Sequence, residues 1–501
     1  MTAPEGAAQA QGKTPGFKAI LGWAGLGAVA FHAAYASTVA SYAIVVYLFA
    51  LVQLARAGTA RGAYYSGLAV GLAIAIGRLD FFWQVFSAGA VGLWYVYAFW
   101  IGLFVALAGG CLRQFGCPRG WLFIPLLWTG LEYFRSELYY LRFSWLNPGY
   151  AFGGAPGMAP LGRAGMYGTG FVLACIACMA AFLWPKSKVR ALGVLAAGAG
   201  GLWLWGQADC PQPQPATGKV HVAGVQMECP SEREVLLRLE ELVRKHPETE
   251  LIVLSEYTFT EPVPGKVKDW CRKSRRYLVV GGEDPAGGNN YYNTAFVIGP
   301  EGETVFRQVK SVPIQFFKDG LPAPEQRLWD SPWGKIGLCI CYDLSYTRVT
   351  DRLVQLGAQA LIVATMDNLD WGRRQHQLHA RVAPVRAAEY GLPIFRLASS
   401  GISQWVDRSG RVRAAGPCPG AGATVCGTLE LRGPGRLPLD RWLAPVSTLA
   451  AGAAGCWLAV LVPVRRCAFH FFRWQFLAPS PNLAPHLNPN ESPLRTRKEG
   501  D

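Results

Sequence analysis

The chain has 501 residues, of which 51% are hydrophobic and only 16% charged, and its formal net charge is +15. This length exceeds one ordinary domain, and the apolar content excludes a wholly water-soluble protein. The basic residues are not clustered with stacking aromatic residues on one soluble segment, which argues against a nucleic-acid-binding protein. Part of the chain is therefore expected to lie in lipid.

Long apolar runs fill the chain up to about residue 207, and another run occurs near the C-terminus. Since a membrane-crossing helix needs roughly 20 apolar residues, we expect a polytopic α-helical membrane domain of about eight transmembrane helices. A short tail, residues 1–17, precedes the domain, and seven of the spans fall in residues 18–207. The expected spans are 18–36, 38–55, 64–80, 83–110, 121–135, 165–184, 190–207 and 444–464.

Basic residues favour one side of these spans. They occur in alternate connections and again after the last span, at Arg465, Arg466 and Arg473. Because cytoplasmic loops carry an excess of Lys and Arg, both termini are expected in the cytoplasm and the polar domain outside it. The charged, Pro/Asn-rich tail 474–501 is expected to be disordered.

The polar domain, residues 219–438, alternates short Val/Ile-rich runs with charged helical stretches. VHVAGVQM, ELIVLSE and ALIVAT predict buried strands, and SEREVLLRLEELVRKH predicts a helix. This alternation predicts an α/β fold whose sheet faces are covered by helices and whose active crevice lies at strand ends.

Three of the apolar runs each deliver one reactive side chain. Glu256 ends LIVLSE, Lys310 ends TVFRQVK, and Cys341 follows GKIGLCI. A cysteine is a strong nucleophile once a base takes its proton, and a buried glutamate with a raised pKa is such a base. A lysine ammonium, with the backbone N–H after the cysteine, stabilises a tetrahedral oxyanion. The trio therefore predicts an acyl-transferring or hydrolytic enzyme.

The pattern alone is also compatible with non-catalytic roles for these three residues. A cysteine in an apolar strand is usually core, and Cys339, expected on the same strand face as Cys341, is interpreted as packing. Glu256 is equally compatible with a surface carboxylate, and Lys310 with a charge at a sheet edge. Because Cys341 stands where the apolar run gives way to polar residues, it differs from Cys339.

Metal and cofactor signals are weak. Cys175 and Cys178 form a CxxC, but inside an apolar run that indicates helix packing. His376 and His379 stand three residues apart with no third ligand nearby in the sequence. We therefore predict neither a metal nor a cofactor.

Residues 219–431 resemble the carbon-nitrogen hydrolase (nitrilase) superfamily. The resemblance rests on the glutamate after an apolar strand, the lysine followed by a proline-containing loop, and the ICYD element around Cys341. Within that superfamily the chain resembles the apolipoprotein N-acyltransferase family, which joins a nitrilase-like domain to a polytopic membrane domain. LLWTGLEYFRSEL and FSWLNPGYAF, in residues 126–152, resemble its membrane-domain motifs, and HARVAPVRAAEYGLPIFRLASSGISQWVDRSGR, residues 379–411, resembles its catalytic domain.

The resemblance implies an α/β nitrilase-like sandwich in which Cys341 is the nucleophile, Glu256 the general base and Lys310 the oxyanion partner. Tyr342 and Asp343 occupy positions that would support this site. An acyl chain would pass from a phospholipid to the cysteine as a thioester, and then to the α-amine of the diacylglyceryl-cysteine that begins an apolipoprotein. The enzyme would be a monomer in the bacterial inner membrane, with its catalytic domain on the periplasmic side.

The segment after Lys310, KSVPIQFFKDGLPAPEQ, departs from the family. It lacks the His-Leu-Val-Pro-Phe-Gly-Glu type pattern, whose glutamate supports the site. Gln315, Asp319 and Glu325 remain as alternatives for that role. Apolar loops at 257–264, 313–321 and 366–371 are candidate lids that enter the membrane interface.

Two other functions stay open. A membrane-tethered nitrilase-type amidase would use the same trio but hand the acyl group to water. A non-enzymatic transporter or scaffold would need several buried charges within its spans, and the first, second, third and seventh spans carry almost none.

Overall fold

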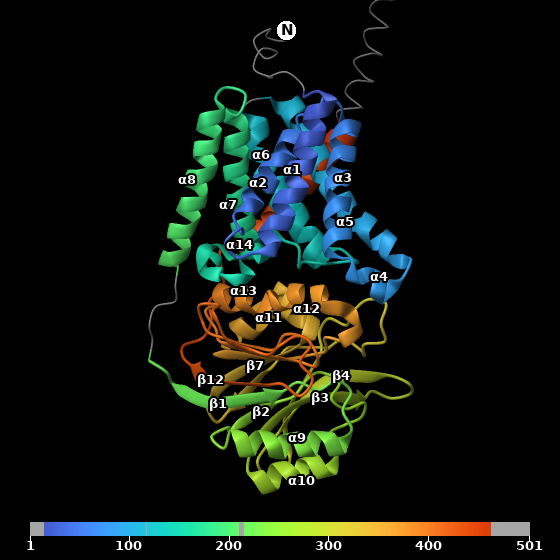
Figure 1. Cartoon of the computed structure of the whole chain (residues 1–501), viewed down its shortest axis with the longest axis vertical. Coiled ribbons are helices and arrows are strands. Elements are labelled where there is room, and N and C mark those ends of the chain that lie inside the picture. The colour runs from blue at the N-terminus through green and yellow to red at the C-terminus, as the bar shows by residue number, and fades with distance from the viewer. Residues whose placement is uncertain (1–14, 117, 210–214, 462–501) are drawn as a thin grey trace, which may run out of the picture. The chain divides into compact units, whose positions relative to one another are not determined.

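The computed structural model describes residues 15–116, 118–209 and 215–461 (Figure 1). Most of the predicted N-terminal tail and all of the tail 474–501 lie outside the described residues. Contacts group the chain into one large unit that ends at Ala454 and a second unit from Gly455. The described part of the second unit is the end of helix α14 (Asp440–Cys456) and a π-helical turn, Trp457–Leu461.

The N-terminal region and α14 form a helical domain (Figure 1). Irregular turns connect α6 to α7: a π-helical turn, Phe134–Leu138, and two 3₁₀ turns, Pro148–Gly154 and Pro156–Met158. The remaining helices are α1 (Phe17–Ala36), α2 (Ala43–Leu54), α3 (Ala60–Arg78), α4 (Phe81–Phe86), α5 (Gly89–Phe115), α6 (Arg119–Tyr133), α7 (Leu161–Leu183) and α8 (Lys188–Ala208).

Five segments among the described residues are long and apolar enough to cross a membrane: α1, α5, α7, α8 and Asp440–Val460. The predicted count of eight is therefore not confirmed. Of the other predicted spans, α2 has 12 residues, α6 has 15 with Pro125 inside, and α3 has 19 but carries Arg at both ends. The predicted span 83–110 is wrong at its start, because the chain turns at Ser87, with φ +48°, between α4 and α5.

Small residues let α3 and α5 approach closely. A Cβ added to Gly71 would lie 2.6 Å from the Ala98 Cα, and one added to Gly67 would lie 2.9 Å from the Val105 Cβ. Such backbone approach is the usual way in which helices associate in lipid, where the hydrophobic effect between helices is lost.

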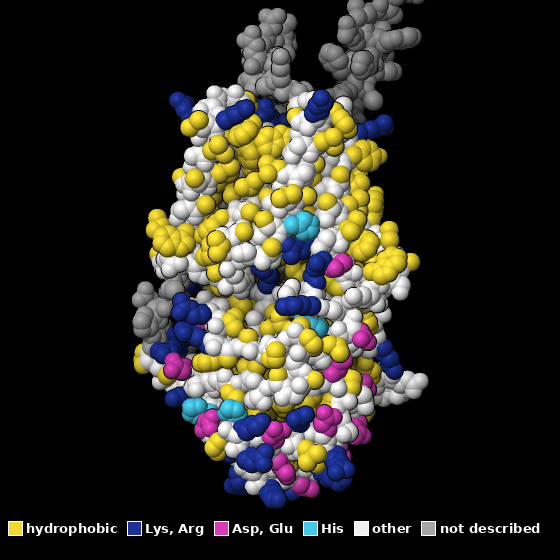
Figure 2. Space-filling view, viewed as in Figure 1, with side chains coloured by type: hydrophobic (Ala, Val, Ile, Leu, Met, Phe, Trp, Pro, Cys, Tyr) yellow, Lys and Arg dark blue, Asp and Glu magenta, His cyan; other side chains and the backbone are white. Residues whose placement is uncertain are grey.

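The surface of the helical domain differs from that of the α/β domain (Figure 2). Hydrophobic side chains cover the helices, and they include exposed Val29, Tyr65, Leu122 and Leu204. Lys and Arg gather at the end where α1 begins, whereas Asp and Glu appear mainly over the α/β domain. An apolar belt with basic residues at one end is typical of a membrane domain.

The α/β domain consists of two six-stranded sheets with a shared apolar core between them. The first sheet has the order β12-β1-β2-β3-β4-β5 and the second β11-β10-β9-β8-β7-β6. The strands of the first are β1 (Gly218–Val225), β2 (Leu251–Val253), β3 (Tyr277–Pro285), β4 (Tyr291–Ile298), β5 (Thr304–Val309) and β12 (Thr424–Leu431). Those of the second are β6 (Leu328–Ser331), β7 (Gly334–Ile340), β8 (Ala360–Thr365), β9 (Ile394–Ala398), β10 (Gln404–Val406) and β11 (Val412–Ala415).

Helices cover the outer face of each sheet (Figure 1). The first sheet is covered by α9 (Glu232–Lys245) and α10 (Gly265–Ser274), and the second by α11 (Thr347–Gln355), α12 (Gly372–Ala380) and α13 (Val382–Tyr390). The predicted helix is α9, which begins after Ser231 because that side chain accepts a hydrogen bond from the Glu234 N–H. The predicted α/β sandwich is confirmed, with the predicted strands in β1, β2 and β8.

Parallel pairing brings several carboxyl strand ends to one region. β2 is parallel to β1 and β3 in the first sheet, and β8 is parallel to β7 and β9 in the second. Open α/β sheets place their reactive side chains beyond such ends. The three predicted reactive residues follow β2, β5 and β7.

Candidate active site

Cys341 is the first residue after β7, and it begins a 3₁₀ turn, Cys341–Ser345. Its φ is +52°, a strained value for a residue with a Cβ. This turn breaks the strand alternation, so that Ile340 and Cys341 both join the core between the sheets, while Cys339 does not. The prediction that Cys339 and Cys341 share a face is therefore wrong, although Cys339 is buried as expected.

Glu256 lies beyond the end of β2 and is 1% exposed. Its Oε1 accepts hydrogen bonds from Lys310 Nζ at 2.8 Å and from Asn293 Nδ2 at 2.7 Å. Its Oε2 accepts one from the Met366 backbone N–H at 2.7 Å. The Cys341 thiol donates to the Met366 carbonyl at 3.6 Å, so Cys341 and Glu256 contact the same residue.

Lys310 follows β5 and is fully buried. Its Nζ lies 2.8 Å from Glu256 Oε1 and 2.7 Å from Asp319 Oδ2. Its backbone N–H donates to the Asn293 carbonyl at 2.8 Å, which fixes the start of the lysine side chain against β4. The structure thus brings together all three residues that the sequence predicted.

Asp319 supplies the second carboxylate beside Lys310. Its Oδ1 accepts hydrogen bonds from the Tyr257 hydroxyl at 2.8 Å and from Asn293 Nδ2 at 2.9 Å, and its Oδ2 accepts one from the Ile314 N–H at 2.8 Å. These contacts hold the loop after Lys310 against the site.

The other two alternatives for this position point elsewhere. Gln315 donates to the Tyr140 carbonyl at 3.1 Å, in the helical domain. Glu325 is exposed and lies 3.6 Å from Arg327. Of the three alternatives left open by the sequence, Asp319 is the one that contacts Lys310.

Burial and charge set the protonation of the trio. Burial raises the pKa of Glu256, and Asp319 adds to this rise while Lys310 opposes it. Burial alone would lower the pKa of Lys310, but Glu256 and Asp319 raise it well above its usual value. Burial and the Glu256 carboxylate raise the pKa of the Cys341 thiol. The site can therefore hold a protonated thiol, an ammonium and a carboxylate with increased basicity.

Asp343 and Tyr342 hold the nucleophile's turn from two sides. Asp343 is buried and accepts hydrogen bonds from the N–H groups of Ser311 and Val312, so it joins this turn to the lysine loop. Burial raises its pKa to about 6. The Tyr342 hydroxyl donates to the Arg142 carbonyl at 3.1 Å, which joins the turn to the helical domain.

Sequence reasoning missed two groups near the trio. Asn293 bridges Glu256 and Asp319, yet in the sequence it only begins an apolar run. A buried cluster after β8 places Asp367 2.7 Å from His379 Nδ1 and 2.6 Å from Arg396 Nη2. Within the described residues no group of three or more His, Cys, Asp and Glu side chains is arranged to hold a metal ion.

An apolar cavity, termed here the junction cavity, opens beside Tyr342. Aromatic side chains of α4 and α5 line it together with residues of the loops 313–321 and 366–371, among them Phe82, Phe86, Trp100, Phe316, Phe317 and Trp371. Phe86 packs edge-on against Phe316, with ring centroids 5.9 Å apart. Two of the three predicted lid loops therefore form the wall of an apolar space next to the nucleophile's turn.

Comparison with known proteins covers both domains. The family model of the apolipoprotein N-acyltransferase N-terminal domain matches residues 24–179, and that of carbon-nitrogen hydrolase matches residues 221–418. The apolipoprotein N-acyltransferase of Shewanella oneidensis is 25% identical over 403 residues, 70% of this chain and 77% of that protein. That of Bordetella bronchiseptica is 27% identical over 363 residues, 59% of this chain and 65% of that protein. A solved carbon-nitrogen hydrolase from Helicobacter pylori is 18% identical, covers 43% of this chain and 90% of that one, and gives a TM-score of 0.37.

The two matched domains follow one another in this chain, and several relatives that match most of it are apolipoprotein N-acyltransferases. The chain belongs to the apolipoprotein N-acyltransferase family. It is an acyltransferase with a carbon-nitrogen hydrolase catalytic domain, and this family implies lipoprotein and phospholipid substrates. The match to the N-terminal domain disfavours the tethered amidase, and the catalytic domain disfavours a transporter or scaffold.

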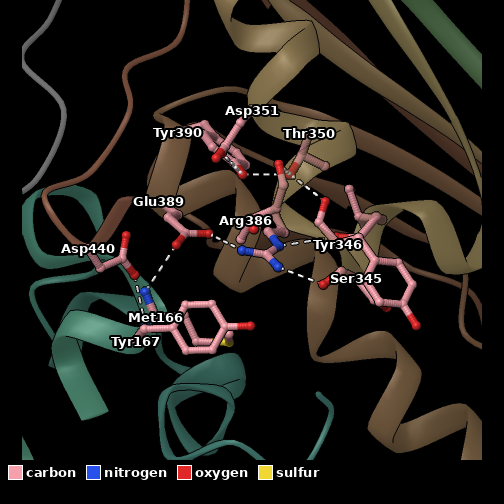
Figure 3. A network of polar contacts seen from close by, with 12 residues as sticks. Met166, Tyr167, Ser345, Tyr346, Thr350, Asp351, Arg386, Glu389, Tyr390 and Asp440 are labelled. Carbon is pink, nitrogen blue, oxygen red and sulfur yellow. Dashed lines mark hydrogen bonds and ion pairs between the residues drawn. The ribbon is translucent and has the colours of Figure 1, made fainter. Parts of the chain in front are cut away.

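In this member of the family a buried ionic network joins the catalytic domain to the helical domain (Figure 3). Arg386 of α13 donates to the carbonyls of Leu344 and Ser345, in the nucleophile's turn, and lies 2.5 Å from Glu389. Glu389 also accepts from the Met166 N–H of α7 at 3.0 Å and from Arg441 of α14 at 2.9 Å. The turn that carries Cys341 is therefore connected to two helices of the membrane domain.

Proposed function

We propose that Cys341 carries an acyl chain between two lipid substrates. The donor is a phospholipid, and the acceptor is the α-amine of the diacylglyceryl-cysteine at the N-terminus of an apolipoprotein. One observation carries this proposal: the buried trio of Glu256, Lys310 and Cys341 is followed in the chain by Tyr342, which lines a cavity with aromatic walls. Tyr342, Asp343 and Asp319 hold the trio in place, and no cofactor takes part.

In the first step Glu256 takes the proton of the Cys341 thiol, and the sulfur attacks the ester carbonyl of the phospholipid. The Lys310 ammonium and the backbone N–H of Tyr342 stabilise the negative oxygen of the tetrahedral intermediate. The ester C–O bond then breaks, and the protonated Glu256 gives its proton to the departing lysophospholipid oxygen. The product is a thioester on Cys341.

In the second step the amine of the acceptor attacks the thioester. Glu256 takes a proton from the nitrogen, Lys310 again stabilises the oxyanion, and the C–S bond breaks to return the thiol. The product is an amide, so the mature lipoprotein is triacylated. The carbonyl carbon stays shielded from water between the steps because Cys341 is 2% exposed and the adjoining cavity is apolar.

We further propose that the enzyme is a multi-pass monomer of the bacterial inner membrane, with a catalytic domain of about residues 219–438 on the periplasmic side. The excess of Lys and Arg where α1 begins supports a cytoplasmic position for that end of the helical domain (Figure 2). Reporter fusions at Gly287 and after Arg473 should report opposite compartments. Signals from the same compartment would contradict this topology.

Transfer between two carriers can be tested with full-length enzyme in detergent. After loading with phospholipid, addition of a diacylated lipopeptide with a free N-terminus should produce an amide with ping-pong kinetics. The N-acetylated lipopeptide is the matched control, and it should accept no acyl chain because it has no nucleophilic amine. Rapid release of free fatty acid with no amide product would favour the amidase instead.

A further inference from the structure

The wall of the junction cavity is mainly apolar, and its only charged side chains are two arginines. Arg135 and Arg142 belong to its wall, and no Asp or Glu does. A cation beside apolar surface is costly unless an anion or several hydrogen-bond acceptors compensate its charge. The partners of these two arginines therefore indicate what the cavity binds.

Arg135 is already compensated within the protein. Its Nη2 donates to Asn147 Oδ1 at 2.7 Å, and its Nη1 donates to the Phe143 carbonyl at 3.2 Å. Its guanidinium also lies 5.2 Å from the centroid of the Tyr97 ring. Arg135 thus holds the connection between α6 and α7 in shape.

Arg142 has no such partner. Among the described residues no carboxylate pairs with its guanidinium and no group accepts a hydrogen bond from it, and its Nε is buried without an acceptor. Its guanidinium carbon lies 5.4 Å from the centroid of the Tyr346 ring, a cation–π distance. The Arg348 guanidinium lies 5.7 Å from the centroid of the same ring.

Arg142 lies where the phosphate of a phospholipid donor would be expected. Its carbonyl accepts a hydrogen bond from the hydroxyl of Tyr342, the residue that directly follows the nucleophile. In a phospholipid the phosphate is joined to the acyl ester through the glycerol backbone, so the two groups must lie near each other. A guanidinium beside the nucleophile's turn is therefore placed to meet the phosphate when the ester carbonyl is at Cys341.

We propose that Arg142 binds the phosphate of the phospholipid donor and positions its acyl ester at Cys341. This inference rests on the proposed function, because it assigns a headgroup contact to the same donor. The planar guanidinium donates two parallel hydrogen bonds to phosphate oxygens, and the apolar surroundings strengthen them. The acyl chain then occupies the aromatic part of the junction cavity.

The test compares two donors that share an acyl chain. Dipalmitoyl phosphatidylethanolamine carries the phosphate, and 4-nitrophenyl palmitate lacks it. Thioester formation on Cys341 is measured by intact-protein mass spectrometry for the full-length wild type and for Arg142→Gln, Arg142→Lys and Arg348→Gln. Arg348→Gln is the matched control, because Arg348 contacts the same Tyr346 ring but lies outside the cavity wall.

Arg142→Gln should raise the KM for the phospholipid by about 10- to 100-fold, the value of a hydrogen bond to a charged group, and leave loading from the nitrophenyl ester unchanged. Arg142→Lys should recover part of the loss, and Arg348→Gln should behave as wild type with both donors. An equal loss with both donors would mean that Arg142 only supports the fold and would overturn the inference. Unchanged phospholipid loading in Arg142→Gln would overturn it as well.

The wild-type protein separates this inference from the proposed function. If it loads from the nitrophenyl ester but never from phospholipid, the phospholipid-donor proposal itself is contradicted, and the inference with it. If the wild type loads from both donors, the Arg142 variants alone decide whether Arg142 binds the phosphate.

Discussion

Two buried glutamates of the catalytic domain, Glu256 and Glu389, have pKa values shifted in opposite directions. Glu256 shares a single lysine with Asp319, whereas Glu389 contacts the guanidinium groups of both Arg386 and Arg441. Burial raises the pKa of both carboxyls. The two arginines reverse this effect and lower the pKa of Glu389 to about 2, while the pKa of Glu256 stays raised.

The difference shows how one residue type serves structure in one place and chemistry in another. Two fixed guanidinium groups keep Glu389 ionised, so it can accept hydrogen bonds but not a proton. One shared ammonium leaves Glu256 able to take the thiol proton and give it back. The number of cations in contact with the glutamate itself, rather than burial, distinguishes the two sites: two guanidinium groups contact Glu389, and one ammonium contacts Glu256.

Replacing each glutamate by its amide should separate the roles most strongly. Glu256→Gln removes the base, and we expect loading of Cys341 from phospholipid to slow by about 10²–10⁴-fold without a change in the thermal unfolding of the detergent-solubilised protein. Glu389→Gln leaves the buried Arg386 without its carboxylate, whereas Arg441 keeps Asp351 and Asp440, and removing one partner of a buried ion pair costs about 3–5 kcal/mol of stability. Its main effect should be a lower unfolding temperature. An unstable Glu256→Gln together with a stable but inactive Glu389→Gln would contradict the assignment of catalysis to Glu256 and of stability to Glu389.

Lys310→Met tests the oxyanion contribution. The methionine keeps the apolar stem but removes the ammonium, and loss of one such donor slows the chemical step by about 10²–10³-fold. Single-turnover loading should report this decrease. Lys335→Met, which changes an exposed lysine of β7, is the control and should load at the wild-type rate. Near-normal loading by Lys310→Met would show that the oxyanion is stabilised by other groups.

Asp319→Asn should have a smaller effect. It weakens one charged contact of Lys310, and such contacts contribute about 1.5–3 kcal/mol, or about 10- to 100-fold in rate. The Asp319 charge raises the pKa of Glu256. When the rate of Cys341 loading is measured against pH, the acidic limb of the curve should therefore move to lower pH in Asp319→Asn. Glu325→Gln, at the exposed alternative position, should change neither rate nor profile.

The pH dependence of the wild type is the mildest test. Loading should decrease as the pH falls through the raised pKa of Glu256, because the protonated base cannot take the thiol proton. The depressed pKa of Glu389 stabilises the fold above the unfolded-state value, and this contribution is lost only as the pH falls toward about 2. Activity should therefore disappear reversibly while the protein stays folded. Simultaneous loss of activity and of thermal stability would contradict this order.

The reactive trio was predictable because each member ends an apolar run, and parallel strands deliver their carboxyl ends to one region. Asn293 was not, because its amide matters only through the cross-strand position that places it between two carboxylates. Asp319 stands in a loop without periodicity, so the sequence left it beside Gln315 and Glu325. Only the fold of that loop selects it.

The membrane domain shows the same limit of sequence patterns. Hydropathy located its long helices, but it cannot detect the turn at Ser87 or the kink at Gly165, where φ is +79°. The strand alternation likewise predicted that Cys339 and Cys341 share a face. The positive φ of Cys341 is a backbone property that side-chain patterns do not reveal.

The central claim is that Cys341 alone carries the acyl chain. Full-length wild-type protein incubated with phospholipid and no acceptor should gain the mass of one acyl chain, and peptide mapping should place it on Cys341 as a thioester released by neutral hydroxylamine. Cys341→Ala should gain nothing, and Cys339→Ala should load as the wild type does. An acyl group on any other residue, or loading that persists in Cys341→Ala, would contradict the account.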